Sequence, residues 1–340
     1  IGFAEECASH EMSPLLPLVA RGDTTVADAY LTPRLAHYVR RFREALGAAH
    51  AGARLQFMQS HGGLVAAEAF RGSNALLSGP AGGLVGMARA GEAIGRRRLI
   101  GFDMGGTSTD VSLYDGAYPR RFDTTFAGLR LQVPMMNIHT VAAGGGSLLR
   151  YAGGRLQVGP DSAGADPGPA CYRRGGPLTV TDVHVLLGRI RPEAFPAVFG
   201  PAGDEPLDAQ AVRARFAALA AEVAEATGRP CAAEALAEGF LQVAVESMAH
   251  AIRHVSVRQG HDAADYALFC FGGAGGQHAC RVADALGIRE VLVHPLAGVL
   301  SAWGIGVADS RVLLRRSVER ALGEVGAELA DAAAALAAEA

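Results

Sequence analysis

The segment Phe102-Asp-Met-Gly-Gly-Thr-Ser-Thr-Asp-Val-Ser112 decides the fold of this chain. An apolar run, Leu99–Met104, predicts a buried strand, and Asp110–Tyr114 predicts the strand that follows it. The glycine pair Gly105-Gly106 lies between them and allows the chain to turn tightly. The pattern therefore predicts a β-hairpin whose tip carries glycines and hydroxyl residues.

The composition of this tip suits phosphate chemistry. Backbone amides at glycines and the hydroxyl groups beside them can bind phosphate oxygens, and a carboxylate at the end of a strand, here Asp103, suits the Mg²⁺ that phosphates also bind. The alternative is a tight hairpin with a polar tip and no ligand.

Three other segments rich in small residues frame the hairpin. Ser78-Gly-Pro-Ala-Gly-Gly-Leu84 precedes it and leads into a predicted helix from Leu84 to about Ile94. Phe271-Gly-Gly-Ala-Gly-Gly276 follows a predicted strand and precedes a predicted helix, and Gly298-Val-Leu-Ser-Ala-Trp-Gly-Ile-Gly306 opens the next helix. Strand, glycine turn and helix in succession favour an α/β domain with ligands at the strand ends.

In this order the four segments resemble motifs of the actin, sugar-kinase and heat-shock-chaperone ATPase superfamily. The hairpin is similar to its second phosphate motif, residues 271–276 to its adenosine motif, and the other two to its connecting helices. The resemblance implies one lobe of this ribonuclease H-like fold, with inserted β-rich loops. Residues 1–70 contain no hairpin like the superfamily's first phosphate motif, so we expect the N-terminal lobe to lie outside this chain.

Longer stretches resemble the hydantoinase A/oxoprolinase family over about residues 1–315. They are 103–113, 140–147, 158–172, 178–182 with 187–189, and 271–280. Gly275-Gly-Gln-His-Ala-Cys280 and the segment Arg21–Pro33 are most similar to the ATP-dependent 5-oxoprolinases of that family.

The resemblance implies ATP-dependent hydrolysis of 5-oxo-L-proline to L-glutamate by way of phosphorylation of the cyclic amide, in a protein of which this chain is an inactive fragment. It implies ATP and Mg²⁺ as cofactors and leaves K⁺ open. The expected partners are a cyclic amide, the missing N-terminal lobe and a hydantoinase B-like region or subunit, in an oligomer. Two alternatives within the family are an N-methylhydantoinase and the ATP-using subunit of a ketone carboxylase. A non-catalytic nucleotide-binding switch is the alternative from another class.

The resemblance also implies roles for single residues. Asp103 is expected to bind Mg²⁺ and, with Thr107, to be catalytic. The phosphate-binding residues are expected to be Gly105, Gly106, Thr107 and Ser108, and the adenosine-binding residues Gly272, Gly273 and Gly275.

Several polar residues near the glycine loops remain open to two interpretations, a metal or substrate site and ordinary hydrogen bonding in loops. They are His139, Asp161, Asp166, Asp182, His184 and His278. On a strand Asp182 and His184 would share one face. Cys171 and Cys280 are interpreted as packing residues, because no histidine or carboxylate arrangement marks either as a nucleophile.

The organisation we expect is one domain over 1–322 and an Ala/Glu-rich tail over 323–340. It includes a β-rich insert at about 115–200, with loops at 141–148 and 158–171, and a helical part at about 207–260. Asp208 is expected to cap a helix that ends near Thr227. An earlier helix is expected to begin at Thr24 or Asp28, with an interruption at Pro33.

Bulk properties exclude some classes of function. The net charge of −3 and the pI near 6.4 show no basic excess, so we expect no nucleic-acid partner. No apolar run is long enough to cross a bilayer and no secretory signal is found, which favours a cytoplasmic protein with reduced cysteines. Because residue 1 is Ile rather than Met, we expect the chain to begin inside a longer protein.

Overall fold

The computed structural model describes residues 6–13, 15, 17–47, 50, 52–126 and 128–339. The chain forms two compact units that alternate along the sequence. Unit 1 comprises residues 1–89, 118–137 and 301–340, and unit 2 comprises residues 90–117 and 138–300. The mixture of strands and helices confirms the α/β class predicted from the sequence.

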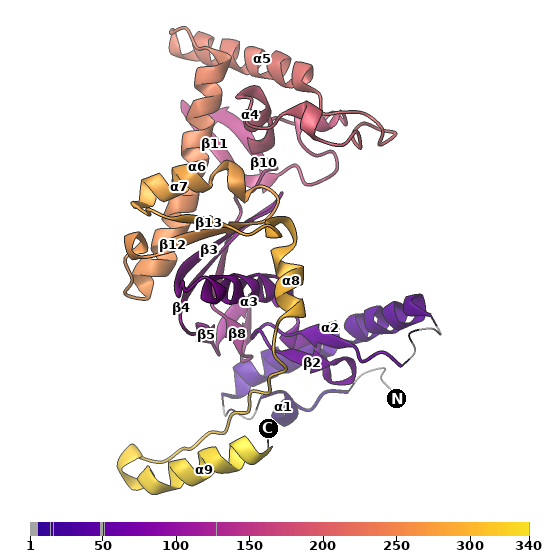
Figure 1. Cartoon of the computed structure of the whole chain (residues 1–340), viewed down its shortest axis with the longest axis vertical. Helices are drawn as coiled ribbons and strands as arrows, with labels where there is room; N and C mark the ends of the chain where they lie inside the picture. The colour runs from indigo at the N-terminus through magenta and orange to yellow at the C-terminus, as the bar shows by residue number, and fades with distance from the viewer. Residues whose placement is uncertain are drawn as a thin grey trace. The chain divides into compact units, whose positions relative to one another are not determined.

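A mixed five-stranded sheet forms the centre of unit 2, in the order β13-β12-β3-β4-β9 (Figure 1). Its strands are β3 (Arg98–Met104), β4 (Thr109–Asp115), β9 (Ile138–Val141), β12 (Ala267–Phe271) and β13 (Val291–Val293). β12 is parallel to both β3 and β13, whereas β4 is antiparallel to β3 and to β9. The predicted hairpin at residues 99–114 is thereby confirmed, with β3 in the middle of the sheet.

Four helices complete unit 2: α4 (Val180–Leu186), α5 (Ala209–Thr227), α6 (Ala233–Arg258) and α7 (Ala279–Leu286). α6 packs against β4, β9 and the other three helices, and Phe102, Phe216 and Phe240 are fully buried in the shared core. The predicted cap of α5 is confirmed, because the Asp208 carboxylate accepts a hydrogen bond from the Ala211 amide over 2.9 Å.

One predicted loop of unit 2 is partly regular. β10 (Ser147–Ala152) and β11 (Arg155–Ser162) form an antiparallel ribbon against α6, so the expectation of a loop from residue 158 was wrong at its start. Gly159 and Pro160 lie in β11 opposite the register shift between Ser147 and Leu149, where a strand tolerates both residue types.

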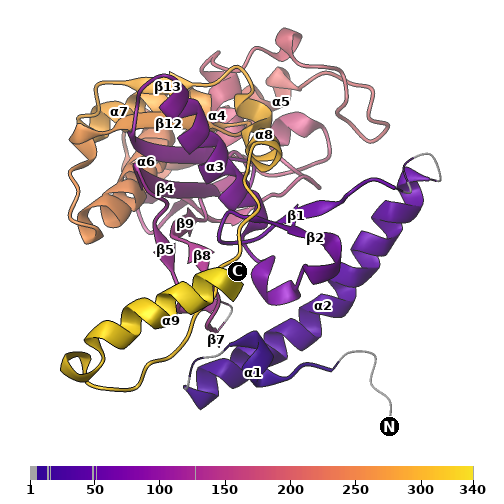
Figure 2. The same cartoon turned by 60° about the horizontal axis from the view of Figure 1, so that its bottom comes forward.

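Unit 1 contains short strand pairs and long helices. Its strands are β1 (Gln56–Met58), β2 (Leu64–Ala66), β5 (Arg120–Arg121), β6 (Thr124–Phe126), β7 (Leu129–Leu131) and β8 (Met135–Met136). Its helices are α1 (Ser9–Met12), α2 (Leu18–Leu46), α9 (Gly326–Glu339), and the parts of α3 (Ser78–Ala93) and α8 (Leu300–Gly306) that fall within its bounds. Figure 2 shows the β1–β2 pair beside the second half of α2, where Phe57 meets Tyr38 and Phe42 edge to face.

The sequence misplaced the start of α2. The helix begins at Leu18, before Thr24, and continues through Pro33. Buried polar side chains on one face of the helix hold it in place: Thr24 accepts a hydrogen bond from the Gln132 amide, Asp28 from the Ser73 amide. These tertiary contacts offset the backbone hydrogen bond that a proline removes.

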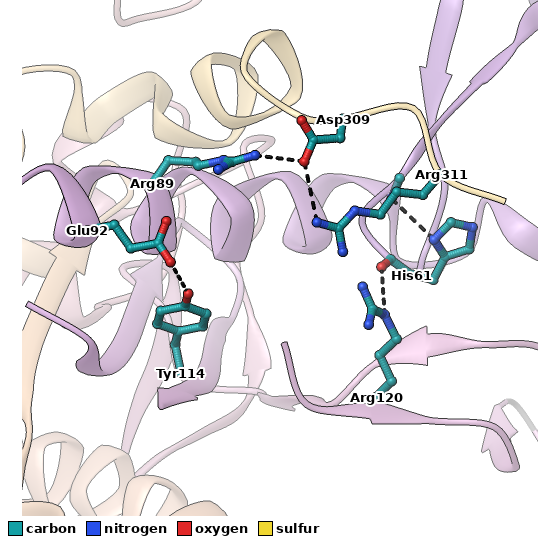
Figure 3. A network of polar contacts seen from close by, with 8 residues as sticks. His61, Arg89, Glu92, Tyr114, Arg120, Asp309 and Arg311 are labelled. Carbon is teal, nitrogen blue, oxygen red and sulfur yellow. Dashed lines mark hydrogen bonds and ion pairs between the residues drawn. The ribbon is translucent and has the colours of Figure 1, made fainter. Parts of the chain in front are cut away.

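Two helices of unit 1 cross at glycines. α3 begins at Ser78, so the glycines before Leu84 are helical rather than part of a preceding turn. A Cβ on Gly304 of α8 would lie 1.9 Å from the Gly82 carbonyl oxygen of α3, so only glycine fits there. Beside this crossing, Arg89 of α3 forms an ion pair with Asp309, which also accepts a hydrogen bond from Arg311 (Figure 3).

Among the described residues, no helix combines the length and the apolar character that a bilayer crossing needs.

Replacing Gly304 by alanine is expected to lower the free energy of unfolding by about 2–3 kcal/mol, because the added methyl group must push α8 away from the backbone of α3. Gly306, at the end of the same helix, has open space where a methyl group would lie and serves as the matched control. Urea unfolding of both alanine variants tests this, and equal stability of the two would contradict the close crossing.

Candidate functional site

The turn between β3 and β4 is held by backbone hydrogen bonds. The Gly105 amide donates to the Ser108 carbonyl over 3.0 Å. The amides of Gly145 and Gly146 donate to the carbonyls of Gly105 and Gly106, over 3.1 and 2.6 Å. Gly106 and Thr107 are exposed at the tip. A second glycine loop, residues 144–146, therefore supports the turn from beneath.

Close packing explains the glycines of this supporting loop. A Cβ on Gly144 would lie 2.6 Å from the backbone carbon of Thr107, and one on Gly146 would lie 3.0 Å from the Gly106 carbonyl oxygen. The loop was recognised in the sequence, but it was not predicted to be part of the site. The three consecutive glycines at 144–146 were the signal that could have found it.

The loop after β12 lies against the end of β3. The Ala274 amide donates to the Met104 carbonyl over 2.9 Å. Gly272 has a φ of +83°, and a Cβ there would lie 2.5 Å from Oδ1 of Asp103. Gly273 is exposed, with open space on its Cβ side, whereas Gly275 is buried against Sγ of Cys270. The structure thus brings the predicted phosphate residues, Asp103 and the predicted adenosine loop to one edge of the sheet.

Two carboxylates lie opposite each other on the hairpin. Asp103 of β3 is paired in register with Asp110 of β4, and cross-strand neighbours have Cβ atoms about 5 Å apart. Burial raises the pKa of Asp110, while Thr140 donates a hydrogen bond of 2.5 Å to its Oδ1. The sequence analysis omitted Asp110, although its position across from Asp103 followed from the hairpin. Two such carboxylates can share one divalent cation.

The turn also offers hydrogen-bond donors to a ligand. Across the part of the chain that the structure describes, the amides of Gly106 and Thr107 have no acceptor in the protein. Exposed amides beside a hydroxyl group and two carboxylates form an arrangement that accepts phosphate oxygens together with Mg²⁺. The residues present therefore fit a metal-bound nucleotide.

Asp182 has a structural role that the sequence analysis did not predict. It lies at the start of helix α4, not on a strand, so the argument that Asp182 and His184 share a strand face was wrong. Its buried carboxylate accepts hydrogen bonds from the amides of Ala170, Cys171 and Thr179 and from the Thr179 hydroxyl, all within 3.0 Å. These donors use the carboxylate fully and hold the start of α4.

His184 and His278 contact each other. Their Nε2 atoms are 2.9 Å apart, and both side chains are buried. His278 directly precedes α7, and its side chain makes no capping hydrogen bond to that helix. Burial lowers the pKa of His184 to about 2 and that of His278 to about 4, so both are neutral at physiological pH.

The remaining candidates lie apart from this pair. His139 stacks near His254, with ring centroids 5.1 Å apart. Of the residues that the structure describes, no three His, Cys, Asp or Glu side chains gather closely enough to hold a metal. Cys171 is buried. Burial, and to a smaller extent the charge of Asp182, raise the pKa of its thiol, which keeps the thiol in the neutral form expected of a packing residue. Cys280 is exposed, so its interpretation as a packing residue was wrong.

The fold and the site define an α/β protein whose glycine-rich loops meet two carboxylates at the strand ends. Residues 21–313 match the model of the hydantoinase/oxoprolinase family. The chain belongs to that family, which confirms the resemblance seen in its motifs.

Relatives in this family include enzymes with different names. The chain is 46% identical to 5-oxoprolinase 1 of Arabidopsis thaliana and 47% identical to the 5-oxoprolinase of Saccharomyces cerevisiae, with 91% of the chain covered in both. It is 37% identical to the caprolactamase subunit alpha of Pseudomonas jessenii over 90% of the chain. The chain spans about a quarter of the length of these 5-oxoprolinases and 43% of that caprolactamase subunit.

Two solved structures share the fold. The ATP-dependent caprolactamase from Pseudomonas jessenii superposes with a TM-score of 0.76 at 35% identity, over 90% of this chain and 44% of that one. The nucleotide-free structure of acetone carboxylase superposes with a TM-score of 0.75 at 28% identity, over 89% of this chain and 42% of that one.

Replacing Asp182 by alanine is expected to destabilise the chain by at least about 3 kcal/mol, because it leaves several buried donors without an acceptor. Asp161, an exposed residue with one ion pair to Arg150, is the control, and its alanine variant is expected to change stability by less than about 0.5 kcal/mol. Chemical denaturation measures both. A stable Asp182→Ala protein would refute the structural role.

The two buried histidines predict a pH dependence of stability. In the unfolded chain their pKa is near 6.5, so between pH 6.5 and 4 the unfolded state binds protons that the folded state does not. The free energy of unfolding should therefore fall as the pH drops, by up to about 1.4 kcal/mol per pH unit for each histidine. A double variant with leucine at 184 and 278 should show a shallower dependence in urea titrations from pH 7 to 4. An unchanged slope would contradict the prediction.

Proposed function

We propose that this chain is the second nucleotide-binding lobe of an ATP-dependent cyclic amide hydrolase that converts 5-oxo-L-proline to L-glutamate. The observation that carries the proposal is the convergence of the Gly105–Ser108 turn, Asp103 and the Gly272–Gly276 loop at one edge of the sheet. Identities of 43–47% to proteins named 5-oxoprolinase support this choice of substrate.

The finer fold assignment rests on sheet order. The order β13-β12-β3-β4-β9, with only β4 antiparallel to the central strand, is the order expected of a ribonuclease H-like ATPase lobe. We therefore propose residues 1–322 as this lobe with its inserts, and residues 323–340 as a tail. The N-terminal lobe, a hydantoinase B-like region or subunit, and an oligomeric assembly are proposed for the full-length protein, consistent with the longer relatives.

Each site residue has a proposed task toward a magnesium nucleotide. The amides of Gly106 and Thr107 donate to phosphate oxygens, with Gly105 and Ser108 closing the turn. Asp103 holds Mg²⁺ directly or through water, with Asp110 beside it. Gly272 and Gly273 let the backbone approach the adenosine, and Gly275 fixes the loop on Cys270. The proposal places the protein in the cytoplasm, where ATP is available, and leaves a K⁺ requirement to experiment.

The proposed reaction requires ATP because hydrolysis of the five-membered cyclic amide has an unfavourable free energy near neutral pH. When bound, ATP supplies a transferable phosphoryl group and the free energy of its hydrolysis. In the net reaction one water opens the ring C–N bond and a second is consumed with ATP, to yield glutamate, ADP and phosphate. In such reactions the protein contributes mainly positioning and neutralisation of charge, which are the tasks assigned to the turn and its carboxylates.

The test is ADP release by the full-length protein with Mg-ATP, with 5-oxo-L-proline, hydantoins, or acetone with bicarbonate, while glutamate is assayed in parallel. We expect equal amounts of ADP and glutamate with 5-oxo-L-proline only. Turnover with a hydantoin or a ketone instead would assign the protein a different substrate known for this family. ATP hydrolysis at the same rate with and without each of these compounds would favour a nucleotide-dependent switch.

Replacing Asp103 by asparagine is expected to lower kcat about 100- to 1,000-fold, because the metal ligand loses its charge while the turn keeps its shape. Asp284, an exposed carboxylate on α7, is the control, and its asparagine variant should retain full activity. Full activity of Asp103→Asn would remove Asp103 from the site.

A further inference from the structure

Helix α4 touches both halves of the candidate site. Near its first residue, the amide and hydroxyl of Thr181 both donate to the Gly145 carbonyl, over 2.7 and 2.9 Å. Gly145 in turn donates to Gly105 of the phosphate turn. In the next turn of the helix, Nε2 of His184 meets Nε2 of His278, which directly follows the Gly272–Gln277 segment. A short helix therefore connects the two glycine loops by a second route, independent of the β3–β12 ladder.

The histidine contact carries a cost that simple packing does not explain. Both side chains are buried, and Nδ1 of each has no hydrogen-bond partner. Since one neutral imidazole must donate from Nε2 and the other must accept, one Nδ1–H donor and one Nδ1 lone pair remain unsatisfied. Two apolar side chains would fill this space without leaving buried polar atoms unpaired. The hydrogen bond between the two rings therefore fixes their relative orientation, which an apolar contact would not do.

The glycine loop is held near its start and at Gly275, which packs on Cys270, without this contact, and its last residues lead into α7. The Gly272 amide donates to the Ala297 carbonyl and the Ala274 amide to the Met104 carbonyl. Beyond Ala274, the His278 ring and a long hydrogen bond of 3.4 Å from Arg189 to the Gln277 carbonyl join the loop to α4 and the segment that follows it. Neutral imidazoles keep their hydrogen bond across the physiological pH range, which suits a permanent link.

We propose that His184 and His278 are positioning residues, which through α4 set the spacing between the Gly272–Gln277 loop and the Gly105–Ser108 turn for nucleotide binding. The inference rests on the proposed nucleotide site and adds residues that touch no ligand themselves. A loop that is already ordered before the nucleotide arrives lowers the entropy cost of binding.

The experiment uses the full-length protein, with three variants: the double variant His184→Leu/His278→Leu, the single variant His184→Asn, and the control His261→Leu. His184→Asn keeps a side-chain donor that can face His278. His261 is a histidine of the same unit, bonded to Tyr266 over 2.7 Å at the opposite end of β12. The readouts are the Kd of Mg-ATP by calorimetry and amide hydrogen exchange over residues 273–278 in nucleotide-free protein.

For the double variant we expect a Kd about tenfold higher, in line with the loss of one buried hydrogen bond, and at least about tenfold faster exchange in the loop. His184→Asn should stay within about threefold of the unaltered protein, and His261→Leu should change neither readout. In turnover the loss should appear in the KM for ATP, with kcat nearly unchanged. If the double variant does not fold, the single variant His184→Leu replaces it, with a smaller rise expected.

A folded leucine variant with unchanged Kd and unchanged loop exchange would overturn the proposal. Equal effects of His261→Leu would do so too, because they would reflect general loss of stability. If the unaltered protein does not bind Mg-ATP, the nucleotide function fails by itself, and loop exchange in the variants still decides whether the histidine pair holds the loop.

Discussion

The site depends on contact between backbones with no side chain between them. The Gly105–Ser108 turn is hydrogen-bonded from beneath by the amides of Gly145 and Gly146, at distances that a methyl group on Gly144 or Gly146 would prevent. Because the support comes from backbone, the turn keeps its shape whatever occupies its outer side, and its outward amides stay available. The cost is the conformational freedom that glycines lose on folding, which the strands on either side of both loops must offset.

Local patterns in the sequence were sufficient to predict the part of the site made by neighbouring residues. An apolar run, two glycines and a second run specify the hairpin, and the same logic placed β12 and the loop that begins at Gly272. The sequence also predicted that these loops meet at one edge of the sheet, because the carboxyl ends of parallel strands lie at the same edge. Asp110 was within reach of the same reasoning, because an antiparallel hairpin pairs it with Asp103.

Contacts distant in sequence could not be predicted in this way. Residues 178–187 have the apolar content of a strand, yet a capping box between Thr179 and Asp182 begins a helix there. Asp182 also accepts hydrogen bonds from Ala170 and Cys171, whose approach depends on the tertiary fold. The His184–His278 contact joins residues 94 positions apart. Likewise Pro33 suggested a break, whereas the contacts of Asp28 and Thr32 with residues 72 and 73 keep α2 continuous. In α2 these tertiary contacts outweighed the local preference of proline.

The charge around the turn restricts which form of a nucleotide it can accept. Among the described residues assigned to the site, Asp103 and Asp110 are the charged ones, and the Gly105–Ser108 turn adds neutral donors. The whole sequence contains no lysine, so no lysine ammonium can neutralise a triphosphate here. Free ATP would therefore meet like charge at the turn, whereas a divalent cation between the carboxylates and the phosphates turns that repulsion into attraction. If this lobe binds a nucleotide as proposed, a metal is a condition for that binding, and the pairing of Asp103 with Asp110 across the hairpin creates the condition.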